Sequence, residues 1–179
     1  MTIKKLLLLL LFIPFVCFTQ IDDKHQSLEV HNSERNSLNL QPLKWSNKLE
    51  KDAKKHANYL ASKDIFRHSN NLKKLKQGEN LYYTMYYVLK NNGEKYFFDE
   101  TNYLTDASIS WLDEKKDYKY AKIGDRKNIF ELIGHYTQMI WSETSEVGIA
   151  QTKSKSGNVY VVARYFPQGN WQGEYPYKP

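Results

Sequence analysis

The stretch that decides the fold is Gly134-His135-Tyr136-Thr137-Gln138-Met139-Ile140-Trp141. It is rich in apolar and aromatic residues, it begins with a glycine, and it carries one histidine. Together with the apolar residues before it, this stretch predicts a short helical segment over residues 128–141 that is entered through a turn. The side chain of His135 is therefore a candidate for a hydrogen-bonded or metal-binding group.

The residues downstream of this stretch predict a β-hairpin. Residues 147–152 and 159–166 are rich in Val, Ile and aromatic side chains, and Ser156 and Gly157 lie between them. No internal repeat and no change of composition marks a second domain.

The residues upstream show helical periodicity in three places. One predicted helix covers residues 28–38, a second runs from a cap at Ser46 to about Leu60, and a third covers residues 101–114. Residues 67–78 are polar and are predicted to form a loop. Because the helices come first and the strands come late, the order favours an α+β fold over alternating βαβ units.

The first 19 residues have the features of a secretory signal peptide. Lys4 and Lys5 precede an uncharged, Leu-rich stretch over residues 6–16, which is too short to span a bilayer comfortably. An uncleaved N-terminal anchor is the alternative, because no clean small-x-small cleavage site follows Val16. The sequence thus predicts a secreted or extracytoplasmic protein with no stable membrane span after removal of the leader, residues 1–19.

The rest of the chain is predicted to form a short polar arm over residues 20–27 and a single domain over residues 28–179. The only cysteine, Cys17, lies in the leader, so the domain lacks a thiol for a disulfide or a thiolate metal site. Loss of the leader removes two lysines and no acid, which lowers the formal net charge from +6 to +4. A polysaccharide or nucleic-acid partner would rest on this modest charge alone, so no nucleic-acid partner is expected.

Short catalytic motifs are absent from the sequence. No two of the five histidines have the His-x-x-x-His spacing that places two imidazoles on one helix face. There is no Gly-x-Ser-x-Gly elbow, no phosphate-binding glycine loop and no cysteine nucleophile after the leader. Any site must therefore be assembled from segments that lie far apart in the sequence.

The stretch at residues 134–141 resembles the signature of the CAP superfamily, which includes cysteine-rich secretory proteins, insect venom allergens and plant pathogenesis-related proteins. The resemblance continues in family order over residues 28–171. It implies a three-layer α-β-α sandwich with a central, mostly antiparallel sheet and a broad cleft. The other matching blocks are Val30-His31-Asn32 with Arg35, Leu43-Lys44-Trp45, Phe66-Arg67-His68-Ser69, Gly78-Glu79-Asn80-Leu81, Trp111-Leu112-Asp113-Glu114 and Tyr165-Phe166-Pro167-Gln168-Gly169-Asn170-Trp171.

The resemblance also implies a site. The family's four cleft residues fall on His68, Glu79, Glu114 and His135, and all four residue types are retained. In the family the two histidines can coordinate a divalent metal, often zinc, while the two glutamates line the same cavity and support the ligands. We therefore expect His68 and His135 to bind zinc or another divalent cation. Two protein nitrogens make a modest, exchangeable site, and affinity should fall below about pH 6 because the imidazoles must be neutral.

Three further positions bear on the family pattern. Ala163 stands where many members have a cysteine, in keeping with the missing disulfides. Leu112 replaces the usual tyrosine, which predicts a more apolar cleft wall near this residue. His31, with Asn32 and Arg35, is expected to pack and hydrogen-bond the first helix against its neighbours and not to form part of the site.

The expected function is that of a binding or interaction module whose cleft holds a divalent metal or a small ligand. A metal-assisted hydrolase that uses Glu79 or Glu114 is one alternative. Ser69 beside His68 suggests a serine hydrolase, but no oxyanion-hole motif accompanies it. A sterol- or fatty-acid-binding protein is the other alternative, with the aromatic residues of 82–98 lining an apolar groove between helices, although core and rim packing explains these side chains equally simply.

Overall fold

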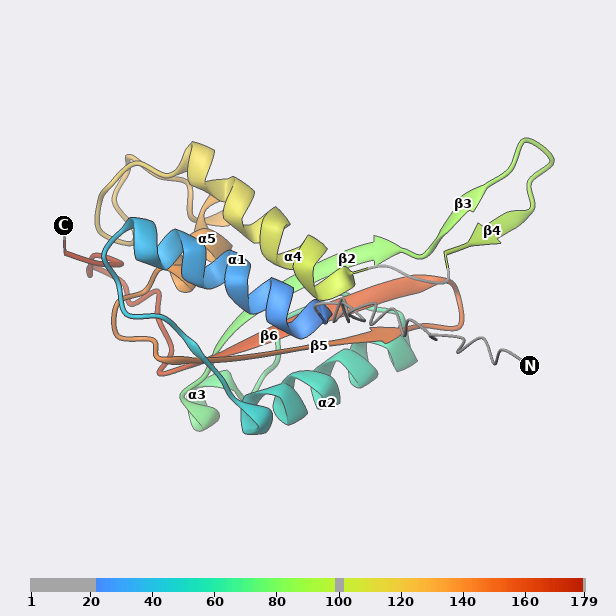
Figure 1. Cartoon of the computed structure of the whole chain (residues 1–179), viewed down its shortest axis with the longest axis horizontal. Helices are drawn as coiled ribbons and strands as arrows, with labels where there is room; N and C mark the ends of the chain where they lie inside the picture. Colours follow the sequence, from blue (N-terminus) through green and yellow to red (C-terminus); the bar gives the residue numbers. More distant parts are fainter. Residues whose placement is uncertain (1–21, 99–101, 179) are drawn as a thin grey trace, which may run out of the picture.

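The computed structural model of the chain describes residues 22–98 and 102–178. The predicted leader, residues 1–19, lies outside the described residues. Figure 1 shows the arrangement of the elements. In chain order they are α1 (Asp23–Ser37), β1 (Lys44–Trp45), α2 (Asn47–Lys63), α3 (Leu72–Leu75), β2 (Gly78–Met85), β3 (Tyr87–Leu89), β4 (Lys95–Phe97), α4 (Tyr103–Leu112), the 3₁₀ turns η1 (Asp113–Asp117) and η2 (Phe130–Leu132), α5 (Gly134–Met139), β5 (Glu146–Lys153) and β6 (Asn158–Phe166).

The main sheet in the described part of the chain has the strand order β1-β5-β6-β2. Strand β1 pairs with β5 in parallel, whereas β5 with β6 and β6 with β2 are antiparallel. The β5–β6 hairpin confirms the hairpin that the sequence predicts. In the β2–β6 register Glu79 lies opposite Arg164, and this pair becomes important in the site.

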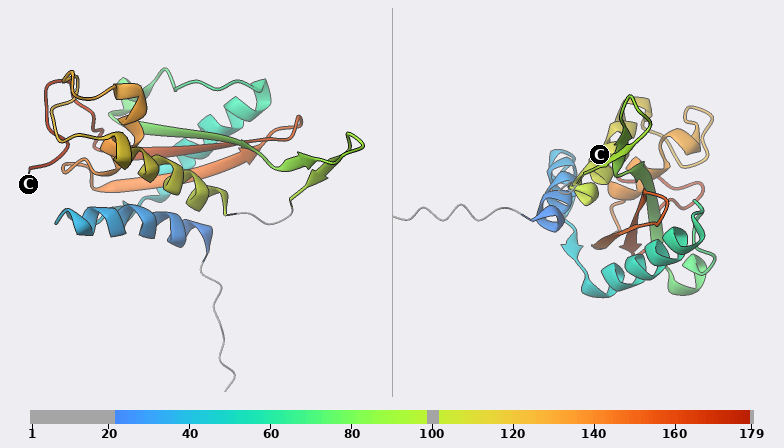
Figure 2. Two further views of the ribbon diagram at one scale, coloured as in Figure 1. Left: turned by 90° about the horizontal axis from the view of Figure 1, so that it is seen from above. Right: turned by 90° about the vertical axis from the view of Figure 1, so that its right-hand side faces the viewer.

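The sheet forms the middle of three layers (Figures 1 and 2). Helix α2 packs on one face, while α1 and α4 cover the other, with α5 beside α4 at one end of the sheet. This is the three-layer α-β-α sandwich that the resemblance implies. None of the described helices combines the length and apolarity needed to cross a bilayer.

Strand β6 shows why the sheet needs cover on both faces. Its buried side chains alternate, as the two-residue period of a strand requires. Val161 and Ala163 belong to the core under α4 and α5, whereas Tyr160 and Val162 belong to the core under α2. Ala163, at a position where the resemblance implies a cysteine in many members, is fully buried, and its methyl group lies in a packed core.

Helix α2 lies directly against the backbone of the sheet at Gly148. A Cβ atom at this position would collide with the backbone of Leu49 and Glu50 at the start of the helix. The Trp45 indole nitrogen, just before the helix, donates to Glu50 Oε2 at 2.9 Å. These contacts hold the N-terminal end of α2 against β5.

The first helix is held to the rest of the domain by buried polar side chains, as predicted. His31 is fully buried, and its Nδ1–H donates to Ser27 O at 2.8 Å, which leaves Nε2 to accept from the Tyr165 hydroxyl at 2.9 Å. The Arg35 guanidinium donates to the backbone oxygens of Met139, Trp141 and Thr144 at 2.9–3.0 Å. A buried neutral histidine and a buried arginine with three backbone acceptors beyond residue 138 thus connect α1 to the C-terminal half.

Two sequence-based boundaries were wrong. The extended arm expected over residues 20–27 is helical from Asp23 onward, because Asp22 caps the helix by accepting from His25 N at 2.7 Å. The Asp23 carboxylate also accepts the Leu104 and Thr105 amides at 2.9 Å, which fixes this end of α1 against the start of α4. The predicted loop over residues 67–78 contains the one-turn helix α3.

The aromatic stretch over residues 82–98, which the lipid-binding alternative places along a groove between helices, consists of strands. It forms the end of β2 and a separate two-stranded ribbon, β3–β4, which extends beyond the sheet in Figure 1. Tyr82 and Tyr86 pack against the core, whereas Tyr96 and Phe97 are exposed on the ribbon. Lys95 ties the ribbon to the β5–β6 turn by donating to Ser156 O at 2.8 Å.

Candidate functional site

Three of the four predicted site residues line one cavity of about 390 Å³. His68 follows α2, Glu79 lies near the start of β2, and His135 lies in the first turn of α5, so the fold joins segments that are far apart in the sequence. Glu114 is not among the residues that line the cavity; it lies in η1 and contacts His135 from behind. The remaining lining residues are Asn80, Phe130, Glu131, Gly134 and Asn170.

The first histidine–glutamate couple joins His68 to Glu79. His68 Nδ1 lies 2.8 Å from Glu79 Oε1, and the same oxygen accepts the Ser69 amide at 2.9 Å. Glu79 has no exposed side-chain surface, whereas His68 is 61 % exposed. The other carboxylate oxygen, Oε2, forms an ion pair of 2.9 Å with Arg164 Nη2. A buried carboxylate therefore holds an exposed imidazole.

Arg164 reaches Glu79 directly across the β2–β6 ladder. Its Nη1 donates to Gln77 Oε1 at 3.2 Å, and Gln77 Nε2 donates in turn to Asp52 at 2.9 Å. Burial lowers the pKa of Arg164, while the negative charges of Glu79 and Asp52 act in the opposite direction. This buried guanidinium provides the positive charge that a buried carboxylate requires.

A second histidine also lies near Glu79. His56, in α2, is buried, and its Nε2 lies 3.7 Å from Glu79 Oε2 and 3.0 Å from Arg67 O. Its ring stacks on Tyr59 with centroids 6.0 Å apart. His56 does not line the cavity, so it is not placed to contact a ligand there. Its bond to Arg67 O instead supports the segment that leads to His68.

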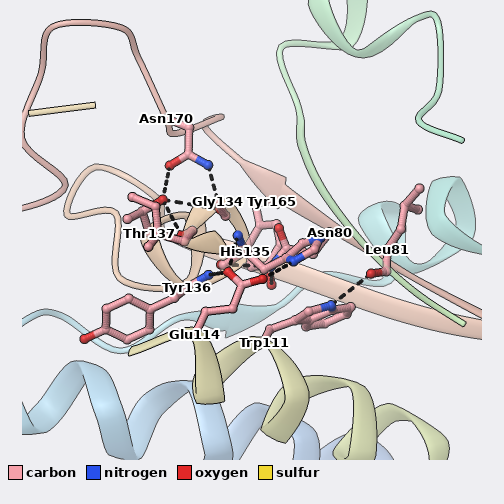
Figure 3. A network of polar contacts seen from close by, with 11 residues as sticks. Asn80, Leu81, Trp111, Glu114, Gly134, His135, Tyr136, Thr137, Tyr165 and Asn170 are labelled. Atoms are coloured by element: carbon pink, nitrogen blue, oxygen red, sulfur yellow. Dashed lines mark hydrogen bonds and ion pairs between the residues drawn. The ribbon is translucent and has the colours of Figure 1, made fainter. Parts of the chain in front are cut away.

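The second couple joins His135 to Glu114 (Figure 3). His135 Nδ1 lies 2.6 Å from Glu114 Oε1, and Glu114 Oε2 accepts the backbone amides of His135 and Tyr136 at 2.9 and 3.0 Å. These are amides at the start of α5, which have no acceptor within the helix. Glu114 therefore caps α5 and orients the imidazole with one carboxylate.

Amide side chains fix the remaining surroundings of His135 (Figure 3). Asn80 Nδ2 donates to His135 O and to the Tyr165 hydroxyl, both at 3.1 Å. Asn170 Nδ2 donates to Gly134 O at 2.8 Å, and its Oδ1 accepts the Thr137 hydroxyl at 2.8 Å. Burial raises the pKa of Tyr165 well above its usual value, so this hydroxyl stays protonated.

Comparison with known proteins shows the same architecture and sequence pattern. Residues 28–165 match the family described as CAP, the cysteine-rich secretory protein family. The chain belongs to the CAP family. The human Golgi-associated plant pathogenesis-related protein 1 is 30 % identical to it over 146 residues, which cover 82 % of this chain and 83 % of that protein. Pathogenesis-related protein 1A of Nicotiana tabacum is 30 % identical over 96 % of this chain and 90 % of its own length.

A solved structure of NaASP2 with Zn²⁺ has a TM-score of 0.70 and 25 % sequence identity to this CAP chain, and the match covers 89 % of this chain and 86 % of that one. A structure of Na-ASP-1 has the same TM-score at 26 % identity, over 87 % of this chain and 41 % of its own length. The fold of the domain is therefore shared with other CAP structures.

The donor set of this CAP cleft fits a small divalent ion only in part. No group of three or more His, Cys, Asp or Glu side chains within residues 22–98 and 102–178 is arranged to hold a metal. The two cleft histidines, however, each direct Nδ1–H to a carboxylate, which leaves the lone pair on Nε2. Carboxylate partners on the distal nitrogen are typical of metal-ligating histidines. The residues present thus suit a site with two nitrogen ligands and water.

One sequence-based expectation about this CAP cleft was wrong, and one alternative that the sequence did not favour is not formed. Leu112 does not form a wall near the histidines; it lines a different groove, between α1 and α4. Ser69 is not poised as a nucleophile, because its hydroxyl donates to Asn71 Oδ1 at 2.6 Å and its amide to Glu79. The serine-hydrolase arrangement is therefore not formed.

Several residues that shape the CAP cleft were not assigned a role from the sequence. Asn80 and Asn170 stood in the matching blocks, but nothing in the sequence showed that both contact the α5 turn. The signal for Arg164 was an arginine inside the apolar strand 159–166, which is unusual unless a buried acid faces it. Glu131, also in the cavity wall, gave no signal in the sequence.

Proposed function

We propose that this CAP domain is a secreted binding protein whose cleft holds a divalent cation, with zinc as the best candidate. Nε2 of His68 and of His135 would be the protein ligands, and water would fill the other positions. The observation that carries the proposal is the matched support of the two imidazoles, each with Nδ1 bonded to a carboxylate at 2.6–2.8 Å beside one cavity. NaASP2, a structural relative, has been solved with Zn²⁺.

The chemistry of the bound ion would follow from this support. The two carboxylates fix the tautomer and the ring orientation, and they make the imidazoles better donors. Two nitrogen ligands hold an ion less firmly than the three or four of catalytic and structural zinc sites. The proposed site is therefore exchangeable, and it loses its ion as pH falls because protons compete for Nε2.

The test is a calorimetric titration of the purified protein with zinc. His68→Ala and His135→Ala should each weaken binding by more than the roughly 10- to 100-fold typical of losing an outer partner. His25→Ala is the matched control, because His25 is an exposed histidine on α1 that does not line the cavity. Equal zinc affinity in the wild type and both cleft variants would refute the metal site.

Secretion is tested separately. Expression of the full chain in a secreting host, followed by N-terminal sequencing of the product in the medium, should give a new N-terminus close to Gln20. A product that stays in the cell membrane with residues 1–19 attached would support the anchor instead.

A metal-assisted hydrolase in the same cleft is less well supported. Both carboxylates that could act as general acid or base are engaged with imidazole and backbone N–H groups. Panels of peptide, ester and glycan substrates test this alternative. Activity that is abolished by Glu79→Gln or Glu114→Gln, and unchanged in the control variant His25→Ala, would support it.

A specific observation favours lipid binding as a second candidate function, at a different place from the one predicted. A groove of about 610 Å³ lies between α1 and α4, and Val30, Ile109 and Leu112 form its apolar part. Lys115, at one side, is already paired with Glu34 at 2.9 Å. Saturable binding of palmitate or cholesterol that is lost in Ile109→Asp but kept in His135→Ala would establish this function independently of the metal.

A further inference from the structure

A second cavity, of about 710 Å³, lies outside the histidine–glutamate cleft. It is formed by α3 with the residue after it, and by the last residue of β6 with the chain that follows. Its size falls in the range of pockets that enclose small organic ligands. The residues that line it are Lys73, Lys76, Phe166, Pro167, Gln168 and Trp171.

The apolar part of this pocket consists of exposed aromatic rings. Phe166 is 40 % exposed and Trp171 is 50 % exposed, and both border the same space, with Pro167 between them in sequence. The other three tryptophans are held differently. Trp111 and Trp141 are buried, and Trp45 is bonded to Glu50. The exposed indole of Trp171 is therefore available for stacking with a ligand.

The polar part of the pocket is cationic. Lys73 and Lys76 are exposed, and neither ammonium group forms an ion pair with any residue in the described ranges. Gln168 is placed by its backbone amide, which donates to Lys76 O at 3.3 Å and ties the two walls together. Two unpaired cations beside two aromatic rings form a site with both charge and apolar surface.

We infer that this pocket binds a small aromatic anion, a planar ring that carries one carboxylate. The ring stacks on Trp171 and contacts Phe166, while the carboxylate faces the two ammonium groups. Aromatic pairs prefer such offset or edge-to-face contacts, and a planar ligand uses both rings at once. The carboxylate makes this ligand bind more tightly than an uncharged ligand of the same shape. This electrostatic contribution to affinity weakens as ionic strength rises, because the lysines are exposed.

The test uses 1-naphthoate as the probe and the indole N–H resonances of the protein as the readout. The chain has four tryptophans, and Trp171→Phe identifies the resonance of interest. Titration should shift the Trp171 signal with saturation and leave the Trp111 signal in place, because that indole is buried and donates to Leu81 O. 1-Naphthalenemethanol, the uncharged analogue, should bind several-fold more weakly.

Matched variants separate the two parts of the site. Trp171→Ala should weaken 1-naphthoate binding about tenfold through lost stacking. The double change Lys73→Gln and Lys76→Gln should weaken it about three- to tenfold, and only at low salt. Lys48→Gln with Lys51→Gln removes the same charge from the exposed side of α2 and should leave the affinity unchanged.

Three outcomes would overturn the inference. One is a Trp171 indole resonance that does not move while the probe shifts the indole signal of another tryptophan. Another is an equal loss of affinity for 1-naphthoate in the Lys73/Lys76 and Lys48/Lys51 variants, which would mean that only the net charge of the protein matters. The third is equal binding of the uncharged analogue.

If Trp171→Ala changes the circular dichroism spectrum, Phe166→Ala takes its place. His68→Ala should leave 1-naphthoate binding unchanged, so the outcome is independent of the metal site.

Discussion

The two histidine–glutamate couples of the cleft use the same residue types but are supported in opposite ways. Glu79 lies inside the domain, without exposed side-chain surface, and depends on the charge of Arg164 across the β2–β6 ladder. Glu114 is 18 % exposed, and backbone amides at the start of α5 donate hydrogen bonds to it. The first couple is therefore built into the sheet, and the second into a helix terminus.

This difference predicts different costs for losing each couple. A buried carboxylate that loses its counter-charge leaves an uncompensated charge in the interior, whereas a cap that is lost exposes amides that water can reach. Both losses should affect the imidazole, but loss of the first couple should destabilise the domain more than loss of the second.

The largest effect is expected for Arg164→Met. Removal of the guanidinium leaves Glu79 buried without its ion-pair partner, which should lower the free energy of unfolding by about 3–5 kcal/mol. Urea denaturation at pH 7 measures this loss. Arg126→Met is the control, because Arg126 is exposed, and it should change stability by less than about 0.5 kcal/mol. Adding Glu79→Gln to Arg164→Met should restore part of the loss. Similar values for the two arginine variants would contradict the structural role of the pair.

The next effect concerns pH and a histidine outside both couples. Burial lowers the pKa of His31 from 6.5 to about 4. The unfolded chain therefore binds a proton more readily between these values, and stability falls as pH falls through them. The loss due to His31 should be about 2 kcal/mol at pH 5 and about 3 kcal/mol at pH 4, relative to pH 7.

His31→Gln removes this titration. Its stability should be lower than that of the wild type at pH 7, and the gap should narrow as pH falls to 4, as followed by urea denaturation at each pH. A gap that stays constant would mean that burial of this imidazole does not contribute to acid unfolding.

Zinc affinity and stability, measured together, distinguish the two couples. Glu79→Gln and Glu114→Gln should each weaken zinc binding about 10- to 100-fold, because each removes the carboxylate that orients a ligand. Only Glu79→Gln should also reduce stability, because it leaves Arg164 buried without its ion-pair partner. In Glu114→Gln the new side-chain oxygen can still accept the two α5 amides that the carboxylate accepts in the wild type. Calorimetry and denaturation of the same samples test both statements, and equal stability of the two variants would remove the distinction.

The smallest effect is expected for the cap itself. Glu114→Ala leaves the His135 and Tyr136 amides without their acceptor and should cost about 1 kcal/mol, as for other lost helix caps. Glu114→Gln is the matched variant and should retain most of that stability. Thermal denaturation followed by circular dichroism compares the two. A loss of stability in Glu114→Gln as large as in Glu114→Ala would show that the hydrogen bonds to the amides are not what stabilises the helix.

Much of the fold could be predicted from local patterns. The helix over residues 47–63 and the hairpin of β5 and β6 have strong periodicity, and both were confirmed. The start of α1 was missed because its first turn is polar, and its stability comes from the Asp22 cap and from contacts of Asp23 with α4. Long-range contacts of this kind leave no local signal.

The site, too, depends on long-range contacts that local patterns do not reveal. The resemblance identified the four residues, but their distribution between cavity wall and support depends on tertiary packing. Glu114 lies behind His135, and Arg164 supports Glu79 from the neighbouring strand. The pairing of β2 with β6 sets this second contact, and no spacing within either strand reveals it.

Ala163 has a practical consequence. With a methyl group buried at this core position, and with Cys17 as the only cysteine of the whole chain, residues 20–179 contain no sulfhydryl group. A single cysteine introduced on the exposed ribbon, for example by Tyr96→Cys, would be a unique attachment point for a dye or spin label. Labelling would need no removal of native thiols, and the protein could be kept in reducing buffer until the label is added.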